Sequence, residues 1–127
     1  MTTDSAAEWP EPRDPVLADA ALRARRYLAT LDERAVAPDP AAVARLRELD
    51  VPLPRESVPA ARALAELDEI VGPATMGMAG RRFFGFVIGG ALPAALAANW
   101  LVSAWDQNAA LEKVTPGVSF LEELALR

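Results

Sequence analysis

The sequence contains no cysteine and no histidine. The absence of cysteine excludes disulfides, thiolate metal sites and a cysteine nucleophile. The absence of histidine removes the commonest general base, the Ser-His-Asp triad and the usual zinc ligands. Basic residues are few as well, since 13 Lys+Arg stand against 18 Asp+Glu for a net charge of -5, which argues against nucleic-acid binding. The 127 residues, 52% of them hydrophobic, therefore indicate one small helical domain without acid–base chemistry or a metal site of its own.

The first 14 residues differ in composition from the rest of the chain. They are polar and acidic, and they are interrupted by Pro10 and Pro12. We expect a flexible N-terminal arm over residues 1–14 and a helical region over residues 15–127. The arm has neither the basic segment nor the apolar segment of a signal peptide, so we expect the protein in the cytoplasm.

Proline marks the expected beginning of most helices. A helix over residues 59–71 is expected to end at Gly72-Pro73, and another is expected to run from Pro93 through Trp105. Three further helices are expected to begin with a capping side chain followed by proline: Asp14-Pro15, Asp39-Pro40 and Thr115-Pro116. The sequence thus predicts a mainly α chain with about five helices and one short extended stretch.

Four of these helices carry apolar residues at three- and four-residue steps, which place them on one face. We expect these faces to form whatever core the chain has. In chain order the residues are Leu17, Ala21, Ala24, Leu28 and Leu31; Val43, Leu46 and Leu49; Leu64, Leu67, Ile70 and Val71; and Val118, Leu121, Leu124 and Ala125.

The run from Phe83 to Trp105 contains no charged residue. Its length would allow a membrane span, because about 20 apolar residues cross a bilayer. Gly89-Gly90 and Pro93 interrupt the middle, however, and disfavour one straight helix. We therefore interpret residues 83–88, which are aromatic and β-branched, as a short buried extended segment. A single membrane span remains the alternative.

The uncharged run has more apolar surface than the narrow apolar faces of the amphipathic helices can bury. Each large apolar side chain in it contributes roughly 1.5–3 kcal/mol when fully buried. For the eleven largest the sum is on the order of 15–30 kcal/mol, which exceeds the ~5–15 kcal/mol net stability of a typical domain. We infer that this segment packs against a second subunit or further protein.

Several small motifs have a structural and a chemical interpretation. The glycines at 85, 89 and 90 lack the spacing of a phosphate-binding loop, so we interpret them as turn residues. Lys113, the sole lysine, lies beside Glu112 and is interpreted as a solvated loop residue rather than a Schiff-base lysine. The segment 105–108, Trp-Asp-Gln-Asn, has two interpretations that stay open, a cap for the preceding helix and the rim of a ligand site.

Several blocks of the sequence, taken in order, resemble the N-terminal region of group II pyridoxal-phosphate-dependent decarboxylases, which include the aromatic-L-amino-acid decarboxylases. The resemblance covers residues 15–127 and about the first quarter of a family member. The blocks are Arg26-Tyr27-Leu28 to Val36-Ala37-Pro38, Arg82-Phe83-Phe84-Gly85-Phe86-Val87, Gly89-Gly90, Leu92-Pro93-Ala94, Trp105-Asp106-Gln107-Asn108, and Thr115-Pro116 with Leu121-Glu122.

The resemblance implies a fold-type I α/β enzyme, a homodimer that decarboxylates an amino acid. Pyridoxal 5'-phosphate forms a Schiff base with a lysine of the large domain, and it acts as the electron sink. That domain is absent from residues 1–127, so no catalytic residue is expected in this chain, and we do not expect the chain to bind the cofactor alone. By the motif match, Phe86, Val87 and Gly89 fall on the substrate-pocket wall. Asn108 and Ala110 fall on the loop that reaches the neighbouring subunit's site.

Three functions therefore stand as expectations. The first is the truncated N-terminal part of a pyridoxal-phosphate-dependent carboxy-lyase, which contributes dimer interface and pocket wall and is not active alone. The pattern of the last helix supports this interpretation, because it runs to Arg127 without a C-cap signal. The second is a stand-alone helical dimerisation module that uses residues 83–105. The third is a single-span membrane protein.

Overall fold

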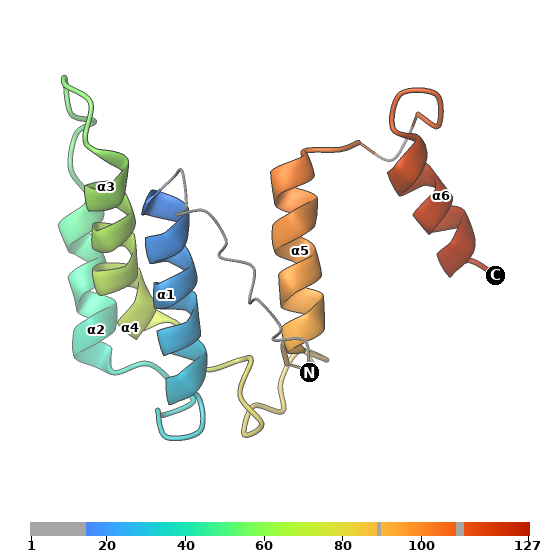
Figure 1. Cartoon of the computed structure of the whole chain (residues 1–127). Coiled ribbons are helices and arrows are strands. Elements are labelled where there is room, and N and C mark those ends of the chain that lie inside the picture. The colour runs from blue at the N-terminus through green and yellow to red at the C-terminus, as the bar shows by residue number, and fades with distance from the viewer. Residues whose placement is uncertain (1–14, 89, 109–110) are drawn as a thin grey trace, which may run out of the picture. The chain divides into compact units, whose positions relative to one another are not determined.

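The computed structural model describes residues 15–88, 90–108 and 111–127, and the chain divides into two units between Gly90 and Ala91. The expected arm and two of the expected site residues, Gly89 and Ala110, lie outside the described residues. Over the described ranges the chain is mainly helical, as predicted, and contains no strand. Figure 1 shows the helices in chain order.

Five continuous helical segments occupy the described residues, which agrees with the number predicted. In the first unit, a 3₁₀ turn, Leu46–Leu49, continues α2, and a π turn, Leu67–Val71, joins α3 to α4. The elements are α1 (Pro15–Thr30), α2 (Pro40–Arg45), α3 (Ala60–Glu66) and α4 (Gly72–Ala74) in the first unit, and α5 (Pro93–Trp105) and α6 (Pro116–Ala125) in the second.

Local capping and proline signals set most helix ends. The Asp39 carboxylate accepts a hydrogen bond of 2.7 Å from the Ala41 amide, which confirms the cap predicted for α2. The predicted stop at Gly72-Pro73 is wrong, since the helix continues to Ala74. The π turn shifts the hydrogen-bond pattern just before Pro73, which has no amide hydrogen to donate.

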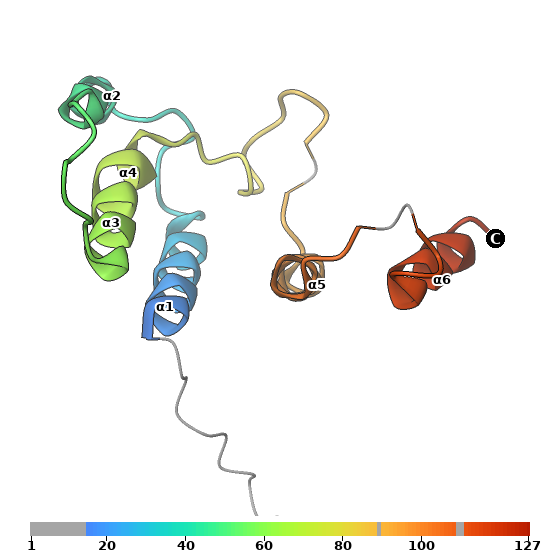
Figure 2. The ribbon, with the colours of Figure 1, turned by 90° about the horizontal axis from the view of Figure 1, so that it is seen from above.

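The helices of the first unit bury little apolar surface. Helix α1 lies beside α3, and α2 contacts α4 (Figures 1 and 2). Ile70 is the one buried hydrophobic residue of the described chain, with 8% of its surface exposed. The α1 face is half-buried from Ala21 to Leu31, whereas Leu17 is exposed.

The apolar stripe of α2 is not buried as predicted. Val43, Leu46 and Leu49 all remain exposed. The periodicity identified the correct face, but burial needs a neighbouring element wide enough to cover it. Helix α2 has six residues, and its main contacts are with short elements of its own unit.

Polar contacts around Arg34 join the turn after α1 to the end of α4. The Arg34 guanidinium lies 4.7 Å from the centre of the Tyr27 ring, a cation–π distance. Its Nη2 donates to the Gly72 and Thr75 carbonyls at 3.2 Å each. The Thr75 hydroxyl donates to the Gly72 carbonyl at 2.7 Å and lies 3.1 Å from the Tyr27 hydroxyl. We call Tyr27, Arg34, Gly72 and Thr75 the Arg34 cluster.

Further contacts extend this connection toward residue 82. The Gly77 amide donates to the Val36 carbonyl at 2.8 Å. The Arg81 guanidinium pairs with the Asp32 carboxylate at 3.0 Å, and Arg82 donates to the Arg34 carbonyl. The segment that precedes the apolar run is thereby held against the turn that follows α1.

The segment 83–88 forms a turn rather than the buried extended stretch that we predicted. Phe86 and Val87 have φ values of 56° and 57°, in the left-handed region. The Ile88 amide donates to the Gly85 carbonyl at 3.2 Å and closes the turn. Phe84, Phe86 and Val87 are 93%, 77% and 105% exposed. Aromatic and β-branched residues favour a strand only where a neighbouring strand or a core covers them, and the described chain offers neither.

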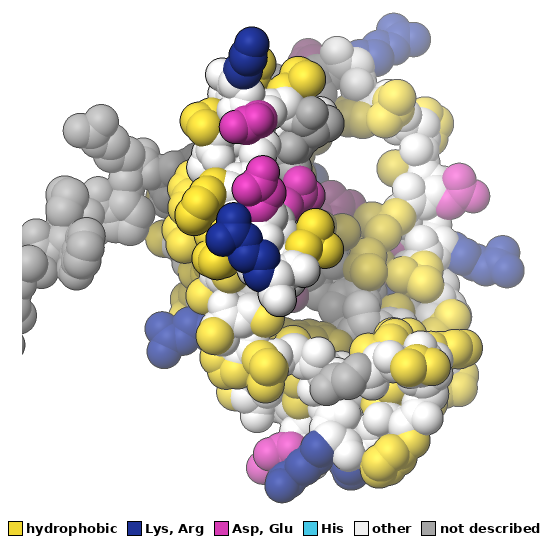
Figure 3. All heavy atoms as spheres, turned by 90° about the vertical axis from the view of Figure 1, so that its right-hand side faces the viewer, with side chains coloured by type: hydrophobic (Ala, Val, Ile, Leu, Met, Phe, Trp, Pro, Cys, Tyr) yellow, Lys and Arg dark blue, Asp and Glu magenta, His cyan; other side chains and the backbone are white. Residues whose placement is uncertain are grey.

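Helix α5 begins at Pro93 and ends at Trp105, as predicted. None of its residues is buried, although it is the most apolar helix of the chain. Hydrophobic side chains are visible over much of the face drawn in Figure 3. Among the described residues, no helix combines the length and the apolar character needed to cross a membrane.

The Arg34 cluster yields a stability prediction. Replacement of Arg34 by Ala removes the cation–π contact and two charge-assisted hydrogen bonds, and we expect the free energy of unfolding to fall by about 1–3 kcal/mol. Urea unfolding followed by far-UV circular dichroism measures this change.

Arg25→Ala is the matched control, because the Arg25 side chain is exposed on α1. Arg34→Lys keeps the charge but loses the planar donor fork, so its stability should fall between those of Arg34→Ala and the unchanged chain. Equal stability of Arg34→Ala and Arg25→Ala would contradict the role given to the cluster.

Candidate functional site

The five expected site residues fall into both units. Phe86 and Val87 are adjacent in the turn of the first unit, and Asn108 belongs to the second unit. Gly89 and Ala110 lie outside the described residues. The structure therefore brings Phe86 and Val87 together, and it defines the surroundings of Asn108 within the second unit alone.

Phe86 and Val87 form an exposed apolar tip. The Phe83 ring lies 6.1 Å from the Phe86 ring, centroid to centroid. A side chain at Gly85 would approach the Phe83 ring to 2.8 Å, so glycine permits the ring to fold over the turn. A left-handed backbone costs an ordinary residue roughly 1–2 kcal/mol, and the branched Val87 side chain adds to that cost. The tip thus combines strain with full exposure.

Asn108 is held through its backbone. Its carbonyl accepts a hydrogen bond from the Thr115 hydroxyl, which also lies 3.1 Å from the Leu111 carbonyl. Thr115 is the one buried polar residue of the described chain. It stands at the predicted N-cap position of α6, but its side chain makes no cap hydrogen bond to that helix. Its hydroxyl instead contacts the Asn108 and Leu111 carbonyls.

The segment 105–108 caps α5. Asp106 has left-handed backbone angles, φ 48° and ψ 47°, and its amide donates to the Val102 carbonyl at 3.2 Å. Asp tolerates this conformation better than most residues because its short side chain bonds locally. The Gln107 side-chain amide donates to the Trp105 carbonyl at 2.7 Å. The structural interpretation of this segment is therefore confirmed.

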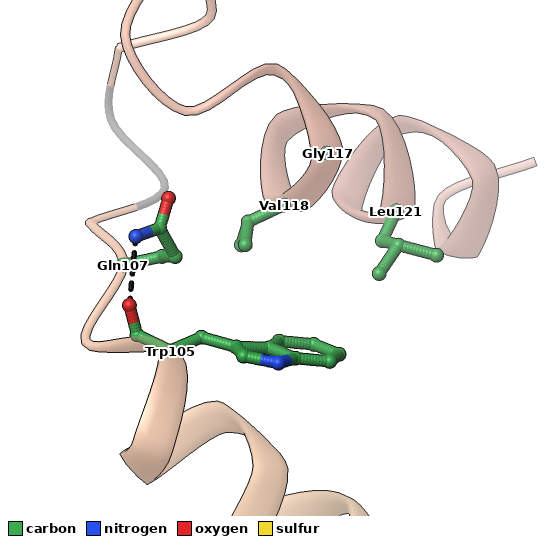
Figure 4. Close-up of a pocket in the computed structure, with 5 residues that line it drawn as sticks. All are labelled: Trp105, Gln107, Gly117, Val118 and Leu121. Carbon is green, nitrogen blue, oxygen red and sulfur yellow. Dashed lines mark hydrogen bonds between the residues drawn. The ribbon is translucent and has the colours of Figure 1, made fainter.

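The same segment also lines a cavity of about 380 Å³. The Trp105 indole forms one side, and Val118 and Leu121 point toward it from α6 (Figure 4). Gln107 and Gly117 complete the lining. This cavity suits a small apolar group, since its lining is mostly apolar. A ligand rim at Trp105 and Gln107 was one of two interpretations that the sequence left open, and the sequence gave no sign that α6 would face them.

A second cavity, of about 320 Å³, lies in the first unit. The Arg23 guanidinium on its wall bonds the Asp19 and Asp68 carboxylates, each at 2.9 Å. These hydrogen bonds, Asp19 first, raise the pKa of Arg23. Because the guanidinium is already engaged by two carboxylates, it is poorly placed to bind an anionic ligand. This pair was not predicted from the sequence, and the four-residue spacing of Asp19 and Arg23 on α1 is the signal that could have indicated it.

Lys113 is exposed in the turn before Thr115 and lines neither cavity, as its interpretation as a solvated residue requires. No group of three potential metal-ligating side chains converges within the described ranges. The arrangement presents exposed apolar surface at the 83–88 turn and along α5.

Comparisons with family models, with curated proteins and with solved structures find no match for this chain.

The Thr115 hydroxyl gives the second prediction. Thr115→Val keeps the side-chain shape and leaves the Asn108 and Leu111 carbonyls without this donor. We expect amide hydrogen exchange in α6, read at Ser119, to accelerate by roughly five- to thirtyfold, since a lost buried hydrogen bond costs about 1–2 kcal/mol. Thr115→Ser retains the hydroxyl and should leave the exchange rate within about twofold of the original. Equal rates for the Val and Ser variants would show that the hydroxyl does not hold this loop.

Proposed function

We propose that this chain serves as the N-terminal segment of a cytoplasmic, homodimeric, pyridoxal-phosphate-dependent amino-acid decarboxylase. In this role it contributes dimer-interface surface and a substrate-pocket wall, and the large domain supplies the reaction chemistry. The order of the sequence blocks between Arg26 and Glu122 motivates the assignment. The observation that carries it is the exposure of the apolar run.

The exposed apolar residues are too many and too bulky for a free surface. Every residue of α5 is exposed or only half-buried, including Trp100 and Trp105 with 44% and 50% of their surface accessible. Large exposed apolar patches mark interaction sites in soluble proteins. Interfaces of obligate dimers run above roughly 2,000 Å² and are more hydrophobic than transient ones, so such a surface suits an obligate partner.

The residues of this chain do not fit the cofactor. A cofactor site of this family needs a buried lysine and a histidine that stacks on the cofactor ring. The sole lysine of this chain is exposed, and the sequence has no histidine. The cofactor, where the large domain binds it, supplies an electron sink for loss of the substrate carboxylate. The part left to this chain is to line the pocket with Phe86 and Val87, exclude water and stabilise the dimer.

A stand-alone dimerisation module is the second candidate. The same exposed surface of α5 supports it, because a second copy would cover this surface without any further domain. The two candidates differ in what completes the fold: an α/β domain with a lysine in the first, a second copy of residues 1–127 in the second.

The DNA that follows the codon for Arg127 separates these functions. We expect an open frame that encodes a domain with a Schiff-base lysine. The longer product should bind pyridoxal phosphate with an aldimine absorption band and release carbon dioxide from an amino acid, whereas residues 1–127 alone should give no saturable band. Unrelated downstream sequence, together with a monodisperse dimer of residues 1–127 in analytical ultracentrifugation, would favour the dimerisation module instead.

The pocket-wall role predicts a substrate effect in that longer product. Phe86→Ala should raise the KM for the amino acid by about tenfold, since loss of an apolar pocket contact costs roughly 1–3 kcal/mol, with cofactor loading unchanged. Leu53→Ala is the matched control, because Leu53 is 93% exposed in the connector before α3. A KM that responds equally to both substitutions would remove Phe86 from the pocket wall.

A further inference from the structure

The turn at residues 83–88 carries a conflict between its side chains and its backbone. Phenylalanine, valine and isoleucine favour extended backbone, and the sequence accordingly predicts an extended segment. The structure instead places Phe86 and Val87 in consecutive left-handed conformations. Strained residues of this kind persist only where their surroundings over-determine them.

Few contacts hold the turn in its conformation. The Phe86 and Val87 side chains are 77% and 105% exposed, so little packing offsets the strain at either residue. Two contacts close the turn: the hydrogen bond of 3.2 Å from the Ile88 amide to the Gly85 carbonyl, and the tilted contact of the Phe83 and Phe86 rings. The base of the turn, by contrast, is fixed to the first unit through Arg81 and Arg82.

We propose that residues 83–88 form a two-state latch, in which the strained turn converts to an extended strand-like segment while its base stays anchored. Extension relieves both left-handed residues and breaks the Ile88–Gly85 hydrogen bond. Because side chains alternate along an extended backbone, Phe84, Phe86 and Ile88 then share one face. Conversion thus turns a scattered apolar tip into a continuous apolar ridge, which is the form that a covering apolar surface would select.

The latch is a property of this chain and holds whether or not the chain completes a decarboxylase. It is therefore testable on residues 1–127 alone. Two substitutions at position 87 shift the equilibrium between the turn and the extended segment in opposite directions. Val87→Gly removes the penalty for positive φ and favours the turn. Val87→Pro fixes φ of residue 87 at a negative value, which the turn cannot accept because Val87 has a positive φ there. The proline also pushes Phe86 toward extended backbone, so this variant favours the ridge.

Amide hydrogen exchange at Ile88 and backbone chemical shifts at Phe86, both by NMR, report the two states. Val87→Gly should slow exchange at Ile88 by about tenfold, since a left-handed residue costs roughly 1–2 kcal/mol and 1.4 kcal/mol is tenfold. Val87→Pro should abolish the protection and move the Phe86 shifts to extended values. Phe84→Gly is the matched control, because Phe84 is exposed but is not left-handed, and it should not slow the exchange.

Protection of the Gly77 amide, which bonds Val36 within the same unit, verifies that each variant keeps its fold. Unchanged Ile88 protection in Val87→Pro with the Gly77 amide still protected would overturn the latch. So would a Val87→Gly variant that exchanges at the original rate.

Discussion

The geometry of the first unit depends on the contacts of the Arg34 guanidinium. The guanidinium contacts the Tyr27 ring and two carbonyls at the end of α4, and so it joins three segments that share almost no core. Ile70 alone is buried among the apolar residues described. A unit with so little burial takes its arrangement from directional polar contacts, because a few hydrophobic contacts do not fix a helix pair in one register. The same contacts lead to Arg82 and thereby place the start of the apolar run.

The apolar run is the opposite case, since it has large side chains and few contacts. Helix α5 forms where its proline and its left-handed Asp106 dictate, yet none of its residues is buried. Local signals suffice for a helix to begin and end, whereas burial requires a second surface. The proposed role as part of a dimeric enzyme follows from that surplus of apolar surface, and the cavity beside Trp105 shows how shallow the cover from α6 remains.

The turn at residues 83–88 combines both situations, polar contacts at its base and uncovered apolar side chains at its tip. Its base is fixed by Arg81 and Arg82, and its tip is exposed apart from the contact between the Phe83 and Phe86 rings. Natural sequences usually agree with their backbone at every level, and disagreement concentrates at functional sites. Phe86 and Val87 are both the residues expected on a pocket wall and the residues whose backbone is strained, so the same two positions carry the functional and the conformational proposals.

The sequence by itself determined the helical class, the number of helical segments and most of their ends, including the Asp39 cap and the Pro93–Trp105 helix. These features depend on hydrogen bonds and backbone angles within a few residues, which the order of residues specifies directly. Tertiary structure alone decided that the stripe of α2 stays exposed and that Thr115 bonds the Asn108 carbonyl rather than capping α6. Each of these outcomes depends on what another segment offers in space, and periodicity records which face is apolar without recording whether anything covers it.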